Sequence, residues 1–114
     1  MAAIAMKTPD ECASLEDVRT EIDRIDRAII AALGRRFEYV RAAAAFKTGA
    51  TSVRAPERIE AMARRWRVWA EENGLSPDVI ERMFRELVAY FTSEELAHWH
   101  AIGPHDRTAT RSDA

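Results

Sequence analysis

One uninterrupted apolar stripe in the first half of the chain limits what these 114 residues can fold into. Ser14 offers a hydroxyl suited to capping a helix start, and no proline follows it before the Thr48-Gly49 pair. Between these points apolar residues recur with the three-and-four spacing of a helix packed on other helices: Leu15, Val18, Ile22, Ile25, Ile29, Ala32, Val40 and Ala43. The spacing predicts a single helix of about 33 residues, ~50 Å long.

A helix of this length does not fit inside a globule made from one such chain. A folded body of about 100 residues has a radius of gyration near 13 Å, so a ~50 Å helix extends beyond it. The rest of the chain is too short to cover the whole apolar stripe. A second copy of the same chain is the simplest cover, and we therefore expect an interlocked helical homodimer.

The remaining sequence predicts two more helices and no strand. The second opens at Ala55-Pro56-Glu57 and stops at Asn73-Gly74, because proline suits a first helical turn and glycine follows a last one. The third opens at Ser76-Pro77-Asp78 and is expected to end before Gly103-Pro104. The prediction is an all-α fold of three helices with a very long first one. Its parts are an N-terminal extension (1–13), a single helical domain (14–103) and a disordered tail (104–114).

Composition excludes several classes of protein. Seventeen Lys and Arg residues against 19 Asp and Glu give a net charge of −2, which provides no basic field for nucleic acid or an anionic membrane. No apolar run approaches the ~20 residues of a membrane span. Cys12 is the single cysteine, so no internal disulfide forms and a cytoplasmic location is expected. His98 and His100 face different ways on a helix, and we expect neither a metal nor another cofactor. The three tryptophans are interpreted as core residues.

Some charged residues do not fit a purely structural interpretation. Continuing the helical spacing places Arg36 in the apolar stripe, where it is either a structural ion pair or a site for a carboxylate or phosphate. Lys47 lies eleven residues later, on the same face if the helix continues, although it also suits a helix C-terminus. Arg58 occupies a first turn, where the helix dipole disfavours a cation. Arg19 is ~25 Å from Arg36 along the helix and can share its ligand only across a dimer interface. Glu95 lies at the edge of the third helix's stripe, and a salt bridge is the simpler interpretation of it.

The chain resembles the all-helical chorismate mutase family, and within it the bacterial isochorismate pyruvate-lyases of salicylate and siderophore biosynthesis. The resemblance covers roughly residues 6–99. The segments that carry it are Met6-Lys-Thr-Pro-Asp-Glu-Cys12, Ile22-Asp-Arg-Ile-Asp26, Ala32-Leu-Gly-Arg-Arg-Phe37, Phe46-Lys47, Ala55-Pro-Glu-Arg58 and Trp69-Ala-Glu-Glu-Asn-Gly-Leu75.

This resemblance implies an intertwined homodimer that binds a small dianion, chorismate or isochorismate. It implies that Arg19 binds a substrate carboxylate in the partner's site and that Arg36 binds the other carboxylate. Lys47 contacts the ether oxygen and closes the site with its loop, and Arg58 lines the same pocket. Glu95 stands where both groups commonly carry glutamine, which implies a catalytic position whose activity rises at acidic pH.

The resemblance also bears on the choice of reaction. Ala55 and Ile59 stand where typical mutases carry an acid and a glutamate for the ring hydroxyl, and the lyases are apolar there. This favours conversion of isochorismate to salicylate and pyruvate, with rearrangement of chorismate to prephenate as a further activity. Chorismate mutase as the main activity is the alternative, and a non-enzymatic dimeric helical adaptor is the third.

Overall fold

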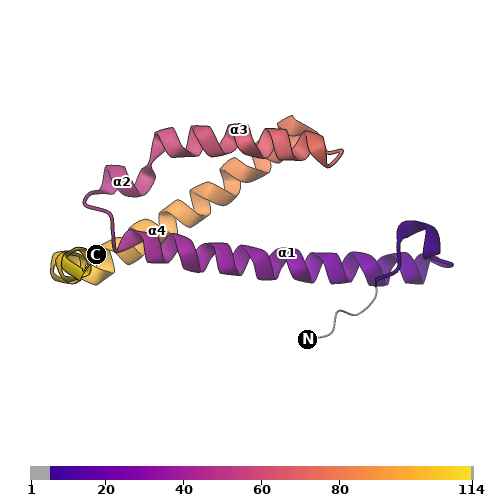
Figure 1. The fold of residues 1–114 in the computed structure, drawn as a ribbon, viewed down its shortest axis with the longest axis horizontal. Helices are drawn as coiled ribbons and strands as arrows, with labels where there is room; N and C mark the ends of the chain where they lie inside the picture. The colour runs from indigo at the N-terminus through magenta and orange to yellow at the C-terminus, as the bar shows by residue number, and fades with distance from the viewer. Residues whose placement is uncertain (1–5, 114) are drawn as a thin grey trace. The chain divides into compact units, whose positions relative to one another are not determined.

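The computed structural model describes the secondary structure of residues 6–113 and the side chains of residues 6–102. Four α-helices follow a one-turn 3₁₀ helix, Pro9–Glu11: α1 (Leu15–Ala44), α2 (Ala50–Arg54), α3 (Pro56–Glu72) and α4 (Pro77–Asp113) (Figure 1). The residues in this described range include no strand, and the all-α prediction is confirmed. The chain divides into two units, Met1–Arg36 and Phe37–Ala114, and the division falls within α1.

Helix α1 begins as the sequence predicts and ends earlier. The Ser14 hydroxyl accepts a hydrogen bond from the Asp17 backbone N–H at 3.1 Å and caps the helix. The last α-helical residue is Ala44, after which the winding tightens, with the Lys47 N–H donating to the Ala44 carbonyl at 3.2 Å. The β-branched Thr48 and the flexible Gly49 that follow are poor helix formers. Lys47 therefore lies beyond the helix, and the predicted single helical face shared with Arg36 is wrong.

The first unit has an apolar stripe that is open to solvent in the single chain. On α1, Ile22, Ile25 and Ile29 are 49%, 48% and 50% exposed, and Leu15 is 61% exposed. These residues repeat every three or four positions, so they line one side of the helix. The apolar stripe predicted from the sequence is therefore present on α1, and it is exposed in the single chain.

The second unit has its core between α3 and α4. Ala63 on α3 packs with Phe84 and Val88 on α4, and the rings of Trp66 and Phe84 lie 4.8 Å apart. Both helices begin near the predicted residues, and α3 also ends near its predicted stop at Asn73-Gly74. Gly74 adopts the left-handed φ of 73° that reverses the chain between them.

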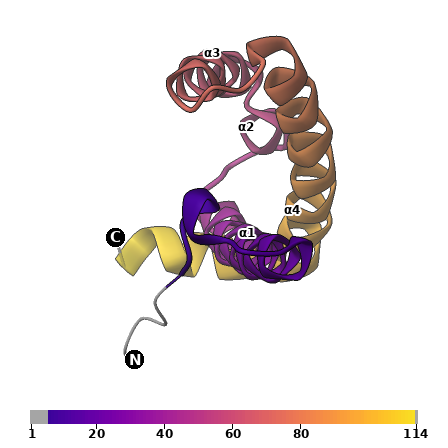
Figure 2. The same ribbon diagram turned by 90° about the vertical axis from the view of Figure 1, so that its right-hand side faces the viewer.

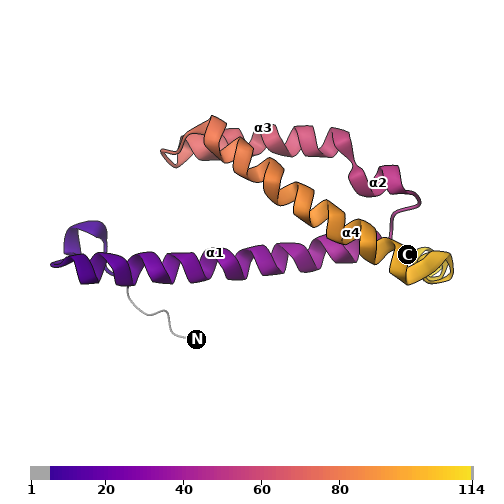
Figure 3. The ribbon, with the colours of Figure 1, turned by 180° about the vertical axis from the view of Figure 1, so that it is seen from behind.

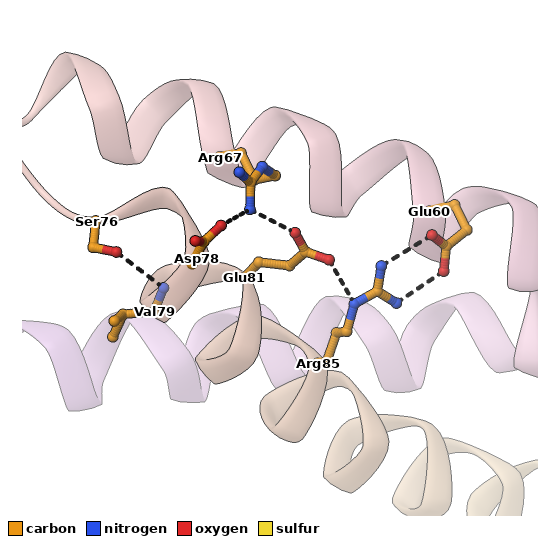
Figure 4. Close-up of polar contacts among 7 residues, drawn as sticks. All are labelled: Glu60, Arg67, Ser76, Asp78, Val79, Glu81 and Arg85. Atoms are coloured by element: carbon orange, nitrogen blue, oxygen red, sulfur yellow. Dashed lines mark hydrogen bonds and ion pairs between the residues drawn. The ribbon is translucent and has the colours of Figure 1, made fainter.

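Five charged side chains link α3 and α4 on the outside of this core (Figure 4). The Arg85 guanidinium donates to both oxygens of Glu60 at 2.8 and 2.9 Å, and its Nε donates to Glu81 at 2.9 Å. Arg67 donates to Asp78 at 2.8 Å and to Glu81 at 2.9 Å. Hydrogen bonds from Arg85 lower the pKa of both glutamates, and Arg67 adds to the effect on Glu81. In turn, these bonds raise the pKa of Arg85.

Two predicted boundaries need correction. The connection expected over residues 48–55 contains α2, whose Val53 is buried against Trp99 of α4, so α2 packs on α4 (Figure 3). Helix α4 does not end before Gly103-Pro104 but continues to Asp113. A proline inside a helix removes one hydrogen bond and bends the helix without always ending it, and Figure 2 shows the yellow end of α4 running in a different direction. Side chains from residue 103 onward lie outside the described ones. The disordered tail (104–114) and the single domain (14–103) stay predictions.

Candidate active site

A buried ion pair joins two of the predicted site residues. The Nζ of Lys47 lies 3.0 Å from the Oε2 of Glu95. Glu95 is only 4% exposed, and it is the buried polar residue among those whose side chains are described. Its Oε2 accepts no hydrogen bond of good geometry, so the Lys47 ammonium is the charge that compensates it. The salt bridge that the sequence left open for Glu95 is present, and its partner is the lysine expected to meet the substrate.

Helix α4 holds Lys47 by its backbone as well as by its side chain. The Trp99 indole Nε1–H donates to the Lys47 carbonyl at 2.9 Å. Glu95 and Trp99 are four residues apart, so they lie on one face of α4. One helical face thus contacts both ends of the lysine: Glu95 contacts the ammonium and Trp99 contacts the main chain.

The surroundings of the pair are apolar on the protein side. Ala44, Val53 and Trp99 form a buried cluster, and Leu96 packs against it. Removing water from a carboxylate is costly unless a cation stays close, and the same apolar setting strengthens the attraction between charges. The Lys47 side chain is 24% exposed against 5% for Glu95, so the ammonium is the solvent-facing end of the pair. An anion arriving from solvent therefore meets the lysine first.

The other three cations lie elsewhere in the chain. Arg58 is exposed in the first turn of α3, and its side chain makes no hydrogen bond or ion pair with any described residue. Arg19 is exposed on α1. Arg36 is half-buried in the last third of the same helix and has an interaction partner. Arg19 and Arg36 belong to the unit Met1–Arg36, whereas Lys47, Arg58 and Glu95 belong to Phe37–Ala114. Of these five, the structure brings Lys47 and Glu95 into contact.

The two apolar positions that bear on substrate choice flank Arg58 in the sequence. Ala55 connects α2 to α3 with a left-handed φ of 40°, an uncommon conformation for a residue with a side chain. Ile59 is half-buried and packs against the cluster of Ala63, Phe84 and Val88. Neither residue brings a polar group to the start of α3.

Sequence reasoning missed the polar role of Trp99. The sequence predicts all three tryptophans to be core residues: Trp99 is buried and Trp66 is half-buried, whereas Trp69 is 52% exposed. The contact between the Trp99 indole and the Lys47 carbonyl is invisible in an apolar pattern. The available signal was the four-residue spacing from Glu95, which places Trp99 beside a residue already singled out.

The chain belongs to the chorismate mutase type II family, whose model matches residues 18–96. It is therefore an enzyme of that family. It is 45% identical over 94 residues to an isochorismate pyruvate lyase of Pseudomonas aeruginosa, a match that covers 82% of this chain and 93% of the relative. It is also 37% identical over 91 residues to the T-protein of Haemophilus influenzae, covering 79% of this chain and 23% of that protein.

Within residues 6–102, no three His, Cys, Asp or Glu side chains are grouped so that they could hold a metal ion. Over the part of the chain that the structure describes, no helix combines the length and the apolar character needed to cross a membrane.

Proposed function

We propose that this enzyme converts isochorismate to salicylate and pyruvate, and that it also rearranges chorismate to prephenate more slowly. The observation that carries the proposal is the 45% identity to an isochorismate pyruvate lyase over 93% of that relative's length. The match to the chorismate mutase type II family supports the second activity.

Both reactions suit a site made of fixed charges. Each substrate is a dianion whose C–O bond breaks in one concerted step, while negative charge grows on the departing oxygen. In the lyase reaction a ring hydrogen moves to the leaving enolpyruvyl group, and the products are salicylate and pyruvate. Such a step needs no nucleophile, metal or general base, but it gains from a held reactive conformer and a cation near the departing oxygen.

In the proposed site, Lys47 is that cation. Its ammonium is the partly exposed end of the ion pair with Glu95, so an incoming ether oxygen or carboxylate can reach it. Arg36 binds one of the substrate's carboxylates, for which a guanidinium is well suited, and Arg58 lines the same pocket. The apolar cluster beside the Lys47 main chain lowers the local dielectric, which strengthens the attraction between the ammonium and the growing charge.

Two observations favour isochorismate as the main substrate. Ala55 and Ile59 present no acid to a ring hydroxyl at the start of α3. Ile59 is in addition committed to packing against the α3–α4 core, so its side chain offers apolar surface. Chorismate mutase as the main activity is the second candidate, supported by the family match over residues 18–96.

A homodimer with shared sites completes the proposal. Half-exposed isoleucines on α1 supply a continuous apolar stripe that a second copy can cover. Arg19 projects from the same helix and is exposed, so it is available to bind a carboxylate in the partner's site.

The test is a product assay on the purified protein. Isochorismate and chorismate are supplied separately, salicylate is read by fluorescence, and prephenate is read after acid conversion to phenylpyruvate. We expect salicylate from isochorismate with a higher kcat/KM than prephenate from chorismate. Prephenate as the dominant product would assign the mutase role. No turnover and no thermal shift with either dianion would favour a non-enzymatic adaptor.

A further inference from the structure

The carbonyl of Lys47 and its ammonium are held by two different groups on α4. The ammonium pairs with Glu95 at 3.0 Å, and the carbonyl accepts from the Trp99 indole at 2.9 Å. If Lys47 acts as proposed above, its ammonium must turn from Glu95 toward the substrate during each reaction. The Trp99 indole contacts only the main chain of Lys47, so this hydrogen bond does not have to break when the ammonium turns.

The packing around Trp99 supports a mechanical role for this contact. Lys47 lies in the short segment 45–49, which has no helix of its own and joins α1 to α2. Ala44 before the segment and Val53 after it are both buried in one cluster with Trp99. The ring of Trp99 therefore packs in one cluster with residues on both sides of the segment, and its N–H binds the Lys47 carbonyl within the segment.

We propose that Trp99 is a positioning residue that latches segment 45–49 and keeps Lys47 in reach of the substrate when the ammonium leaves Glu95. The inference rests on the proposed function for its effect on turnover, whereas the latch itself is a property of the free protein. Without the latch, substrate binding must also order the segment. KM is then raised more than kcat is lowered, because the bound dianion restores the order through its own contact with Lys47.

Trp99→Phe removes the donor and keeps an aromatic ring. A neutral hydrogen bond of this kind corresponds to about threefold to tenfold in an equilibrium. We therefore expect kcat/KM to fall by about that factor at a temperature well below the melting point. Trp66→Phe is the matched control: it makes the same chemical change in the α3–α4 core, away from Lys47, and is expected to leave kcat/KM near the parent value.

Limited proteolysis tests the latch without using activity. Trypsin cleaves after Lys47 only when segment 45–49 leaves α4, and it cleaves after Arg85, inside α4, only when the helix opens. Trp99→Phe is expected to raise cleavage after Lys47 by about threefold to tenfold relative to cleavage after Arg85. An equal rise at both sites would mean general loss of stability and would overturn the proposal.

A second variant covers the case in which the smaller phenylalanine ring unfolds the chain. Benzothienylalanine incorporated at position 99 keeps the bicyclic shape and lacks only the N–H. It should reproduce both the faster cleavage after Lys47 and the raised KM. If it cleaves and turns over like the parent, Trp99 is a core residue only, and the proposal fails while the assigned reaction stands. If the parent itself turns over neither substrate, the proposed function fails, and faster cleavage after Lys47 still supports the latch.

Discussion

Replacing Glu95 by glutamine changes one charge at the centre of the proposed site. At the observed 3.0 Å, the attraction between the Lys47 ammonium and the Glu95 carboxylate is about 5–6 kcal/mol at an effective dielectric of 20. The cost of removing water from the buried carboxylate offsets most of this and leaves on the order of 1–2 kcal/mol. A substrate that draws the Lys47 ammonium away from Glu95 has to supply this free energy from its own contacts.

The expected result of Glu95→Gln is therefore faster turnover near neutral pH. Each 1.4 kcal/mol corresponds to tenfold, so kcat/KM is expected to rise roughly tenfold. A glutamine also donates a hydrogen bond at every pH, whereas a glutamate donates only when protonated.

The assay is the steady-state kcat/KM of salicylate formation near neutral pH for the parent, Glu95→Gln and the control Glu94→Gln. Glu94 is the neighbouring exposed glutamate on α4, so its substitution makes the same charge change away from Lys47. Glu94→Gln should keep the parent's kcat/KM. If Glu95→Gln also keeps the parent's kcat/KM, or lowers it, Glu95 is a structural ion-pair partner and the reasoning is refuted.

Three further predictions concern assembly and stability. Light scattering at micromolar concentration should give about twice the monomer mass of 12.9 kDa. A folded monomer would contradict the proposal that a second copy covers the apolar stripe of α1. Mixing inactive Arg19→Ala with inactive Arg36→Ala should restore part of the activity, because a heterodimer holds one intact site; no recovery after confirmed subunit exchange would place Arg19 in its own chain's site. At pH values above the ordinary glutamate pKa of 4.5, Glu60 and Glu81 are charged in both the folded and the unfolded chain, and Arg85→Met should lower the melting temperature. Because Arg85 lowers both pKa values in the fold, its contribution should disappear as the pH falls below them, and a difference in melting temperature that is independent of pH would contradict the network of Figure 4.

The sequence predicts where α1 and α4 begin because these starts are decided locally. Ser14 and Ser76 each precede a helix and accept a backbone hydrogen bond from its first turn, as their hydroxyls predict. The end of α1 was placed a few residues too late, because no single residue there forbids a helix. Helix α2 was missed because five residues are too few to show a period.

The candidate site could be predicted residue by residue but not as an arrangement. Lys47 and Glu95 stand out as charges beside apolar stripes, yet their contact depends on how segment 45–49 folds onto α4. Trp99 stands out only through its spacing from Glu95, since its apolar ring hides a polar contact. Arg58 is exposed within the single chain, so nothing in its own unit shows what it binds.

The most direct test of the account is the single-turnover rate of isochorismate in a variant that lacks Lys47. The comparison is best made between Glu95→Gln and the double variant Lys47→Ala/Glu95→Gln, because removing the lysine alone leaves a buried carboxylate without a cation. Loss of one group that stabilises a growing oxyanion typically costs 10²–10³ in rate, and we expect a fall of about that size with the helical signal and melting temperature retained. Near-normal turnover in the folded double variant would contradict the central claim that Lys47 meets the departing oxygen.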